Sequence, residues 1–510
     1  MSTASEVADF FAGRSVLITG GTGFLGKVLV EKLLRSVPRL QTIYLLIRSR
    51  KGVDAKQRWR ALAEKCELFE SIQNTKVVKE NPDGSETVVL TNLLDKVVPL
   101  SGDITECDLG LNIDDCELIC DSVSVVFHCA ATVRFDERMR LAIQMNVEGT
   151  HRLLRLCDRM KRLDAFVHAS TAYCNCDRSH VIESVYPSPV PWRRLAEGVE
   201  WLSDEMFDQL TPLLLGVRPN TYTFTKAVAE SMIVDDGEAN KHLPIVIVRP
   251  SIVTAIWRDP IPGWIDNVNG ATGLIAVGAK GLLRSIYGDM KRVRADLVPV
   301  DVVANTLILA AWHRASDKDA PMPVIHCATG MLNPVYWNAL VDTTINFFTH
   351  EMPLADLYRI PGGRTTTNYL EHRLRLFFDH LVPAYAIDLI CNLTGRKAFM
   401  VRMYEKINKA LGTLEYFYSH EWDFESTGIV SLNNRLSDND RKSFCIDVKQ
   451  IDWETYLKDY HSGVRRHIFK ELPSSVAVAR KVHFRRRLLT KMVLVSFLSL
   501  FLSVIIRYVM

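Results

Sequence analysis

The sequence lacks the cysteine spacing of a disulfide framework or of a zinc site. Its 11 cysteines are spread over 510 residues, and the two closest, Cys174 and Cys176, do not form a C-x-x-C pair. An odd number of scattered cysteines is typical of a reduced, cytosol-facing protein, so we expect free thiols and no metal site. The N-terminus also lacks a basic segment followed by an apolar core, and we therefore expect no signal peptide.

The sequence also lacks an excess of charge of either sign. It contains 62 Lys and Arg residues against 59 Asp and Glu residues, which gives a net charge of +3. Nucleic-acid-binding proteins usually show a strong basic excess, so we expect no nucleic-acid partner. Hydrophobic residues make up 48% and charged residues 24% of the chain, values that argue against disorder and against a multi-span transporter. No internal repeat is present, and the length predicts two to four domains of about 150 residues each.

Short apolar runs that alternate with helical stretches predict an α/β fold. Residues 15–22 form a β-branched run that ends in glycines, and a segment with helical spacing and a second run at 42–48 follow it. This order is typical of a βαβ unit. Because hydrophobicity in the runs is continuous rather than alternating, we expect a Rossmann-type, doubly wound parallel sheet covered on both faces. Further runs lie at 96–104, 124–131, 165–171 and 245–253.

The turn after the first run carries a glycine motif that indicates a dinucleotide site. It reads G-x-x-G-x-x-G at the junction of a predicted strand and helix, which is the structural context that the motif requires. Glycines let the backbone approach a pyrophosphate closely, and the helix N-terminus presents N–H groups and partial positive charge to it. The residues that we predict to bind the cofactor here are Thr19, Gly20, Gly21, Thr22, Gly23, Phe24, Leu25 and Gly26.

The end of the second run favours NADPH over NADH. An acidic residue at this place would bind the ribose 2′-hydroxyl of NAD, whereas this chain has Arg48 and Arg50, whose cationic side chains suit a 2′-phosphate. The alternative is that both arginines are solvated loop charges. After the next run, Asp103 is placed to touch the adenine edge, although a turn or N-cap role fits it nearly as well. We also expect cofactor contacts from three residues near the ends of the runs: Ile104, Ala130 and Pro250.

A tyrosine and a lysine four residues apart predict a catalytic pair. On a helix, Tyr222 and Lys226 face the same side. A lysine ammonium beside a tyrosine lowers the pKa of the phenol, which then protonates a carbonyl oxygen as hydride reaches the carbon. The lysine also has the reach to bond the nicotinamide ribose. Opposite the tyrosine we expect a hydroxyl from the end of the run at 165–171, with Thr171 as first choice and Ser170 as second, because ligands bind at the carboxyl edge of a parallel sheet.

Two further polar residues lie in segments that we expect to reach the same site. Asn146 is predicted to order water or backbone near the lysine, with a helix N-cap as the alternative. His128 is predicted to lie near the cofactor, and a core histidine is an equally good interpretation.

The pattern of the sequence changes after about residue 330. We expect an NADP-binding catalytic domain over residues 1–335 and a smaller, mostly helical domain over residues 355–470. Between residues 52 and 95, a charged segment with an N-P-D-G-S-E turn signal interrupts the α/β rhythm, and we expect a helix plus a surface loop there. Residues 360–367 are predicted to be a linker, and residues 370–409 to be helices with a break at T-G-R-K.

The C-terminal end contains an apolar run that the average composition hides. Residues 488–510 carry only two charges, Lys491 and Arg507, both near the ends. A helix of this length crosses a hydrocarbon core of roughly 30 Å. The preceding residues Arg485–Arg487 favour the cytosolic side of a membrane. We therefore expect a single transmembrane anchor with the catalytic domain in the cytosol; the alternatives are a hairpin, an interfacial helix or a buried core helix.

The motifs together resemble those of the alcohol-forming fatty acyl-CoA reductases, a family of the extended short-chain dehydrogenase/reductases, and the layout is closest to animal members. The resemblance covers most of residues 14–460. It rests on VLITGGTGFLGKVLVEKLL, IYLLIRSRKG, LSGDIT, FHCAATVRFDE, NVEGT, HASTAYCN, YTFTKAVAE and IVRPSIV, and on DHLVPAYAIDLICNLTGRK, YFYSHEWDF and WETY in the C-terminal part.

The resemblance implies a two-step reduction in a pathway to lipid, wax or ether-lipid precursors. Hydride converts a long-chain fatty acyl-CoA into a hemithioacetal, which collapses to an aldehyde and free coenzyme A. A second hydride yields the primary alcohol, so that two NADPH are consumed per turnover. Thr171, Tyr222 and Lys226 would serve both steps, because both polarise a carbonyl oxygen.

Two segments bear on how such an enzyme meets a membrane. Ser496, Ser499 and Ser503 fall on one face of the tail helix, which would permit self-association. The apolar segment 374–393 is not predicted to be a second span, because it contains Arg375, Asp379, His380, Pro383 and Asp388. We expect this segment to lie against the bilayer, to line an acyl tunnel or to pack within the C-terminal domain.

Two other classes of function fit parts of the sequence. A membrane-bound steroid or sugar-nucleotide oxidoreductase of the same superfamily would share the glycine turn and the tyrosine–lysine pair, but it would not predict the helical segment 355–470. A non-enzymatic NADP-binding scaffold would keep the fold, but the intact set of Thr171, Tyr222 and Lys226 argues against it. For an anchored enzyme, the endoplasmic reticulum and the peroxisome both fit.

Overall fold

The computed structural model describes residues 5–50, 52–73, 75–80, 86–236, 242–318 and 320–509, without the side chains of 76–80, 86–90 and part of the tail helix. The chain divides into two compact units, and each unit is made of several segments. Unit 1 comprises Met1–Ile261, Asp296–Pro334 and Trp422–Ile451. Unit 2 comprises Pro262–Ala295, Val335–Glu421 and Asp452–Met510.

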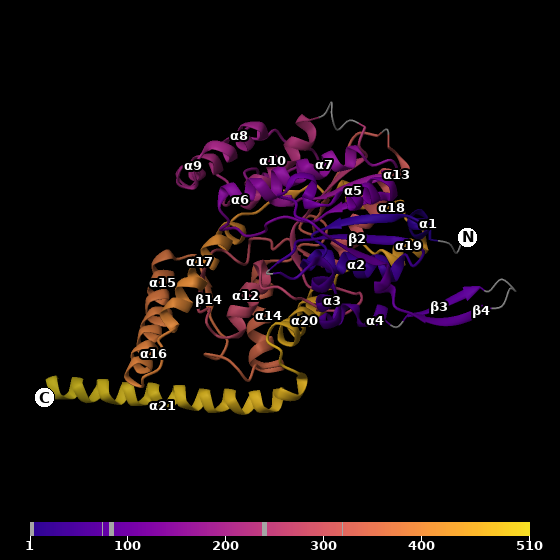
Figure 1. Cartoon of the computed structure of the whole chain (residues 1–510). Coiled ribbons are helices and arrows are strands. Elements are labelled where there is room, and N and C mark those ends of the chain that lie inside the picture. Colours follow the sequence, from indigo (N-terminus) through magenta and orange to yellow (C-terminus); the bar gives the residue numbers. More distant parts are fainter. Residues whose placement is uncertain are drawn as a thin grey trace. The chain divides into compact units, whose positions relative to one another are not determined.

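A seven-stranded parallel sheet forms the centre of unit 1 (Figure 1). The chain begins in the middle of this sheet, adds two strands on one side, and then crosses over and runs outward on the other side. The direction reverses between β1 and β6, which is the switch point at which open α/β sheets bind ligands. The order across the sheet is β13 (Val324–Cys327), β9 (Ile245–Pro250), β7 (Ala165–Ala169), β6 (Val123–His128), β1 (Ser15–Thr19), β2 (Thr42–Ile47) and β5 (Val97–Ser101).

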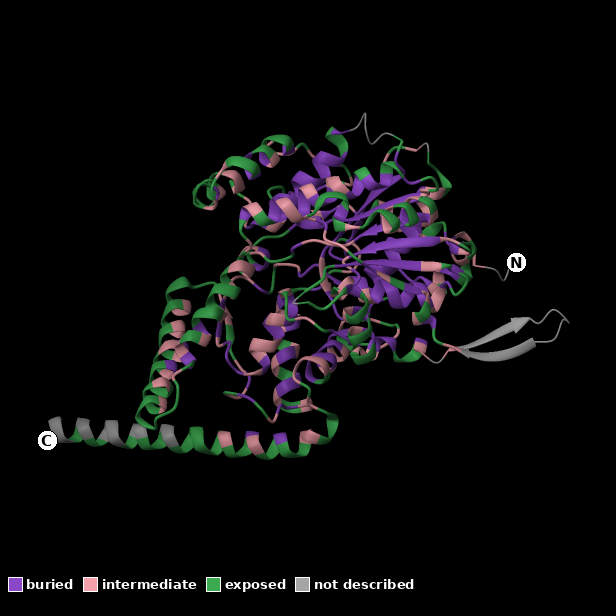
Figure 2. Cartoon of the chain, in the orientation of Figure 1, coloured by how far each residue is buried: buried purple, intermediate pink, exposed green. Residues whose placement is uncertain are grey.

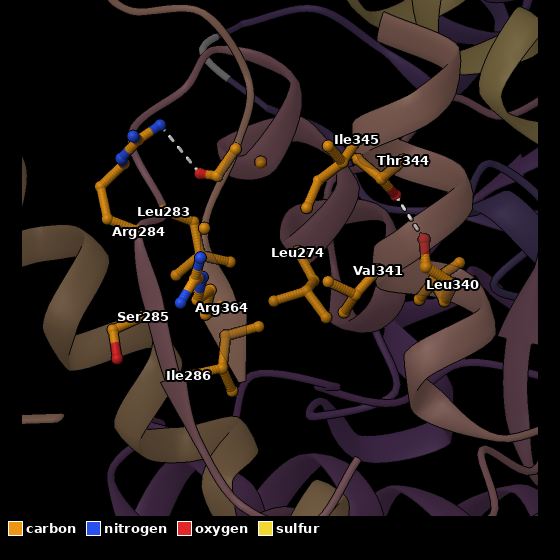
Figure 3. A pocket seen from close by; sticks show the side chains of 13 residues that line it. Leu274, Leu283, Arg284, Ser285, Ile286, Leu340, Val341, Thr344, Ile345 and Arg364 are labelled. Carbon is orange, nitrogen blue, oxygen red and sulfur yellow. Dashed lines mark hydrogen bonds between the residues drawn. The ribbon is translucent and has the colours of Figure 1, made fainter. Parts of the chain in front are cut away.

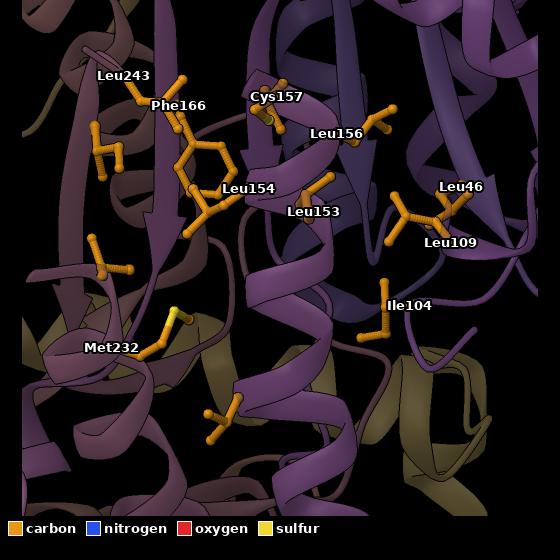
Figure 4. Packing of buried hydrophobic residues seen from close by; sticks show 14 of the residues in the cluster. Leu46, Ile104, Leu109, Leu153, Leu154, Leu156, Cys157, Phe166, Met232 and Leu243 are labelled. Atoms are coloured by element: carbon orange, nitrogen blue, oxygen red, sulfur yellow. The ribbon is translucent and has the colours of Figure 1, made fainter. Parts of the chain in front are cut away.

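Helices cover both faces of the sheet, which confirms the predicted doubly wound fold. Every residue of β1, β6, β7 and β9 is buried, as the continuous apolar runs require (Figure 2). One group of packed helices consists of α2 (Phe24–Ser36) and α13 (Val300–Ser316). The other consists of α5 (Ile113–Ser122), α7 (Gly149–Asp158) and α10 (Thr221–Asp235). Figure 4 shows the core of the second group, in which leucines of α7 meet Phe166 of β7 and Met232 of α10.

The segment between β2 and β5 differs from its prediction. It contains α3 (Ala55–Lys65), α4 (Glu70–Gln73) and a hairpin of β3 (Thr75–Glu80) and β4 (Glu86–Thr91). The two strands pair in antiparallel register, with Val77 opposite Val89, so the predicted surface loop is wrong over these residues. Two β-branched runs around a turn signal are typical of a hairpin. The turn itself, residues 81–85, lies outside the described residues.

The C-terminal part of the chain contributes to both units. Residues 422–451 belong to unit 1, where β15 (Asp423–Phe424) pairs with β8 (His180–Val181), whereas residues 262–295 belong to unit 2. The compact units therefore do not follow the continuous boundaries 1–335 and 355–470. The other elements of unit 1 include α1 (Glu6–Phe11), α6 (Met139–Ile143), α8 (Trp192–Trp201), α9 (Asp204–Leu215), β10 (Ile252–Thr254), β12 (Leu297–Pro299), α18 (Thr427–Asn434) and α19 (Asp438–Ser443).

Unit 2 is mostly helical, in agreement with the prediction for the C-terminal region. The predicted linker at 360–367 contains a short strand, β14 (Arg364–Thr366), which pairs with β11 (Ser285–Tyr287). The helices of the unit are α12 (Gly270–Ala279), α14 (Trp337–Asn346), α15 (Tyr369–Arg375), the π-helical turn η7 (Leu376–Leu381), α16 (Val382–Leu393), α17 (Met400–Ser419), α20 (Trp453–Gly463) and α21 (Val476–Val509).

Helices α15, η7 and α16 run on as one helix over Tyr369–Leu393. Within the described residues, this is the helix that is long and apolar enough to cross a membrane, with a mean hydropathy of 1.3 over its most apolar window, of which 11% is buried. The sequence-based argument against a span in this segment counted its charges without knowing which way they point. Helix α21 contains the predicted anchor at 488–510, but Met510 and many of its side chains lie outside the described residues, so the anchor stays a prediction.

Candidate active site

The turn between β1 and α2 forms a cradle that side chains would fill. Gly20 has a φ of +74°, and a Cβ atom on it would lie 2.7 Å from the backbone nitrogen of Ala130. A Cβ atom on Gly26 would lie 2.2 Å from the Gly20 carbonyl oxygen. Helix α2 follows directly, and its N-cap residue, Gly23, offers no side-chain oxygen to the first turn. The backbone therefore closes tightly under a helix N-terminus, which is the arrangement that binds a pyrophosphate.

Of the other predicted residues of this turn, two are buried and support its backbone, and four are accessible at its edge. The buried Thr19 hydroxyl accepts a hydrogen bond from the backbone N–H of Ala130 at 3.2 Å, which ties the end of β1 to the end of β6. Gly21 is buried, and a Cβ atom on it would meet Leu45 at 2.7 Å. The accessible rim, on which a ligand would rest, consists of Thr22, Gly23, Phe24 and Leu25.

Two residues predicted to bind the adenosine end of the cofactor lie side by side. The Arg48 guanidinium at the end of β2 is 3.8 Å from the Asp103 carboxylate after β5, and 58% of the Arg48 side chain is exposed. Asp103 also accepts hydrogen bonds from the backbone N–H and the hydroxyl of Thr105, so that it acts as a turn residue as well. Arg50 is exposed two residues beyond Arg48. The sequence reasoning missed Arg58, whose guanidinium donates to the Arg48 carbonyl oxygen.

The remaining predicted cofactor residues occupy the carboxyl ends of β5, β6 and β9. Ala130 is half-buried beside Gly20, and Pro250 is the buried last residue of β9. The Ile104 side chain is buried in the hydrophobic cluster of Figure 4, so that only its backbone is left for a cofactor. His128 is fully buried and hydrogen-bonded to Thr19 at 2.7 Å and to a threonine of α7 at 2.9 Å. Burial lowers the pKa of His128 to about 3, so this residue is a neutral core histidine.

Three predicted catalytic residues converge at the carboxyl end of β7. Tyr222 and Lys226 lie one turn apart on α10. The Lys226 ammonium donates to the carbonyl oxygen of Ala169, the last residue of β7, at 2.7 Å. Two residues further on, Thr171 hydrogen-bonds Tyr222 and also donates to the Pro250 carbonyl oxygen at 3.4 Å. The site therefore holds a phenol, a hydroxyl and an ammonium at the sheet edge where ligands bind.

The electrostatics of the pair differ from the prediction. Burial lowers the pKa of Lys226 to about 8, although neighbouring Cys129 and Glu230 act in the opposite direction. Burial also raises the pKa of Tyr222, and the hydrogen bond with Thr171 only partly offsets it. The predicted lowering of the tyrosine pKa by the lysine is therefore wrong, because the ammonium is directed at a backbone carbonyl. A protonated phenol is nevertheless the form that donates a proton to a carbonyl oxygen.

Asn146 orders backbone near the lysine, and it is not a helix N-cap. It lies in the π-helical turn η4 (Gln144–Glu148), between α6 and α7. Its amide oxygen accepts from the Thr132 backbone N–H at 2.9 Å, and its amide nitrogen donates to the Thr132 carbonyl oxygen and to the Thr225 hydroxyl. Thr225 precedes Lys226, so Asn146 joins the loop after β6 to the catalytic turn of α10. π-Helical turns are frequent at functional sites.

Ser170 lies beside a buried ion pair that the sequence reasoning missed. Its hydroxyl interacts with Glu230, which lies one turn beyond Lys226 on α10. The Glu230 carboxylate is 2.6 Å from the Arg249 guanidinium of β9, and the two side chains are 1% and 0% exposed. Burial works to raise the pKa of Glu230, but the charge and hydrogen bonds of Arg249 outweigh it, and the pKa lies below its ordinary value. A lone arginine in the apolar run 245–253 was the available signal, because a buried charge needs a partner.

The loop after Thr171 rests on the segment that returns from the C-terminal part. Tyr173 packs edge-to-face against Trp422 and Phe424, with ring centroids 5.3 and 5.2 Å apart. The Trp422 indole donates to the Cys176 carbonyl oxygen at 3.0 Å. These contacts lie within unit 1 and hold the strand end that carries the catalytic hydroxyl. The aromatic run Y-F-Y-S-H-E-W-D-F was visible in the sequence, but nothing local indicated its partner.

Comparisons with known proteins agree with this site. Two family models described as male sterility protein match the chain, over residues 18–307 and 379–471. The chain is 39% identical over 476 residues to fatty acyl-CoA reductase 1 of Mus musculus, covering 93% of this chain and 88% of that protein. It is 39% identical over 487 residues to fatty acyl-CoA reductase 2 of Mus musculus, covering 94% and 90%. The chain belongs to the fatty acyl-CoA reductase family.

Solved structures support the same fold for this reductase. The terminal R domain from the myxalamid PKS-NRPS biosynthetic pathway has a TM-score of 0.58 at 19% identity and covers 91% of this chain and 93% of its own. The R domain of a nonribosomal peptide synthetase from Mycobacterium tuberculosis has a TM-score of 0.55 at 18% identity and covers 91% and 96%. The reductase is thus an oxidoreductase with a nicotinamide cofactor site, and its glycine turn and tyrosine–lysine pair both lie within the first matched model.

Proposed function

We propose that this reductase converts long-chain fatty acyl-CoA into the primary fatty alcohol with two NADPH and releases coenzyme A. The observation that carries the proposal is the convergence of Thr171, Tyr222 and Lys226 at one strand end of a sheet whose switch point holds a phosphate-binding turn. The identity of 39% to proteins named fatty acyl-CoA reductases supports the choice of substrate. The matched C-terminal model at 379–471 disfavours the steroid and sugar-nucleotide alternatives, which do not predict that region.

The chain's own residues supply proton transfer and orientation. When bound, the nicotinamide supplies the hydride. Tyr222 and Thr171 hydrogen-bond the thioester carbonyl oxygen, and the phenol donates its proton as the oxygen gains charge, giving the hemithioacetal. Return of that proton from the hemithioacetal oxygen to Tyr222 re-forms a carbonyl as the carbon–sulfur bond breaks, which gives the aldehyde, and coenzyme A leaves as the thiolate, which takes a proton from water. The aldehyde oxygen then meets the same two donors, and a second hydride and proton give the alcohol.

The cationic end of β2 supports NADPH as the cofactor. Arg48 has an exposed guanidinium held beside Asp103, and Arg50 adds a second cation, so a 2′-phosphate would find charge without displacing a buried group. We expect Arg48→Ala to raise the KM for NADPH far more than the KM for NADH. Steady-state kinetics with both cofactors test this, and equal effects on the two KM values would refute the 2′-phosphate argument.

A narrow apolar cavity in unit 2 supports contact with part of an acyl chain. It lies between α12, α14 and the β11–β14 pair (Figure 3). Leu274, Ile286 and Val341 face this space, and Arg284 closes one side by donating to the carbonyl oxygens of Ile360 and Gly362. Mostly aliphatic walls with few polar groups suit a hydrocarbon chain.

The tail helix supports attachment to a membrane with the catalytic unit in the cytosol, at the endoplasmic reticulum or the peroxisome. Ser496, Ser499 and Ser503 are exposed along α21, which would leave them available for self-association. A chain that ends after Val482 is expected to be extracted from membranes by alkaline carbonate, whereas the full chain stays with them. Equal resistance of the two chains to extraction would contradict the tail anchor.

Expression of the full chain in yeast, followed by analysis of fatty alcohols, tests the activity. The wild-type chain is expected to produce long-chain alcohols, and Tyr222→Phe is the matched control because it removes only the phenolic proton donor. If the two strains contain the same alcohols, the proposed function is wrong.

A further inference from the structure

The helix over Tyr369–Leu393 exposes an apolar face along its whole length. It is about 37 Å long at about 1.5 Å per residue. Apolar patches of this extent are rare on soluble monomers and mark interaction sites. The exposed side chains on this face range from 38% for Ile387 to 78% for Leu393, and they are Tyr369, Leu370, Leu374, Phe377, Phe378, Val382, Tyr385, Ile387, Leu389, Ile390 and Leu393.

Apart from Arg373, which is exposed among the apolar side chains, the charged residues of the same helix are bound on its other side. The Arg375 guanidinium pairs with Glu371 at 2.9 Å. The Asp388 carboxylate accepts hydrogen bonds from the backbone N–H groups of three residues at the start of α17, at 2.8–3.0 Å: Phe399, Met400 and Val401. His380 is fully buried and accepts from the Arg284 backbone N–H at 3.1 Å. The polar residues that argued against a span therefore belong to the inner face, and Arg373 is the charged residue left exposed on the outer, apolar face.

The helix is fixed to its own unit by this inner face. α16 pairs with α17, and Ala384 lies in a small core with Met400 and Tyr404. The His380 ring stacks on the Tyr404 ring with centroids 5.0 Å apart. Because these contacts hold one side in place, the helix cannot be surrounded by lipid without losing them. The geometry fits a helix that lies in the plane of a membrane interface rather than one that crosses it.

Basic residues stand at the tip of the helical hairpin formed by α16 and α17. The turn between the two helices and the first turns of α17 expose four basic side chains against one acidic side chain, Glu405. Such a cluster beside an apolar face is complementary to anionic lipid head groups. The four basic residues are Arg396, Lys397, Arg402 and Lys406.

We propose that the apolar face of Tyr369–Leu393 inserts into the interface of an anionic lipid membrane, as a second contact besides the predicted tail anchor. The aliphatic and aromatic side chains enter the boundary between head groups and acyl chains, and the basic tip contacts the head groups. The same helix contacts Arg284 and Ser285, which border the apolar cavity of unit 2. The contact does not depend on the proposed reaction.

Photocrosslinking in vesicles tests the contact. The full chain, with the photoreactive amino acid p-benzoylphenylalanine at Phe378, is bound to vesicles of phosphatidylcholine containing a fifth phosphatidylserine, floated and illuminated. Tyr385, about two helical turns further along, is the second position, in case the substitution at Phe378 disturbs the fold. The matched control position is Trp201 in unit 1, which is 73% exposed against 62% for both test residues. Adducts to lipid acyl chains are expected at both test positions, several-fold above the control.

The outcomes separate the possible occupants of this face. Crosslinks to a second copy of the chain would show a protein interface, and crosslinks within the chain would show a covered face. Either result overturns the proposal. A crosslinking yield equal to that at Trp201, or a chain that does not float with the vesicles, overturns it as well. The double variant Arg396→Glu/Lys397→Glu is expected to reduce the yield at Phe378 several-fold with phosphatidylserine but not without it. An equal yield in both vesicle types for this variant and its parent would contradict the role of the basic tip.

Discussion

Removing the charge of Glu230 should destabilise the reductase more than any surface ion-pair substitution. In Glu230→Gln the side chain keeps its shape, but the Arg249 guanidinium loses a carboxylate that lies 2.6 Å away, where both side chains are at most 1% exposed. Arg249 keeps its hydrogen bonds to the carbonyl oxygens of Ile182 and Ser184 at 3.2 and 2.8 Å. These bonds satisfy the N–H groups but do not neutralise the charge.

The expected cost follows from that geometry. Leaving one partner of a buried pair uncompensated costs about 3–5 kcal/mol, and the retained hydrogen bonds favour the lower end, about 3 kcal/mol. For a folded unit of roughly 330 residues, with an unfolding entropy of about 2.1 cal/mol/K per residue, about 3 kcal/mol corresponds to a fall in Tm of roughly 4 °C. Thermal melting of the detergent-solubilised full chain, followed by circular dichroism, measures the shift.

A surface pair provides the matched control. Arg194 and Glu197 on α8 lie 3.0 Å apart, like the buried pair, but their side chains are 76% and 58% exposed. Glu197→Gln makes the same chemical change at the surface, where water and salt screen the charges and the pair contributes little to the free energy of unfolding. We expect its Tm to equal that of the wild type. If Glu230→Gln lowers the Tm no more than Glu197→Gln does, the argument that burial makes the pair indispensable is refuted.

Three further predictions concern the site. A Cβ atom on Gly26 would lie 2.2 Å from a carbonyl oxygen of its own turn, so Gly26→Ala should raise the KM for NADPH about tenfold or more; an unchanged KM in steady-state assays would contradict the cradle. Thr171→Val should lower kcat by about 10²–10³, whereas Ser170→Ala should lower it far less, and equal losses would show that the wrong hydroxyl was chosen. Because Lys226 has a pKa of about 8 and is predicted to bond the nicotinamide ribose as the ammonium, kcat/KM should fall as the pH rises through about 8, and a flat profile there would exclude this role.

Local patterns were enough to predict the sheet and to propose most residues of the candidate site. Each central strand is a continuous apolar run because it is buried on both faces, so burial is readable from β1 or β9 alone. The glycine turn works through backbone geometry over eight residues, and the pair of Tyr222 and Lys226 depends only on helical spacing. Properties that act over a few residues leave a signature in the sequence.

The features that the sequence did not indicate depend on partners far along the chain. Trp422 supports Tyr173 across roughly 250 residues, and no local pattern encodes that contact. The pKa of Tyr222 rises because of burial, which cannot be known until the surrounding loops are placed. The charge of Asp388 counted against a membrane span, and no pattern in the sequence indicated that the start of α17 binds its carboxylate.

The pairing of β8 with β15 means that the support of the candidate active site is completed late in synthesis of the chain. Roughly 240 residues separate these two strands, so at about 5–20 residues per second the partner of β8 emerges some 12–50 s after β8 itself. During that interval the nascent chain has its nucleotide turn and its catalytic helix but exposes the aromatic surface of Tyr173. That surface is covered only when the stretch from Trp422 to Ile451 has been made.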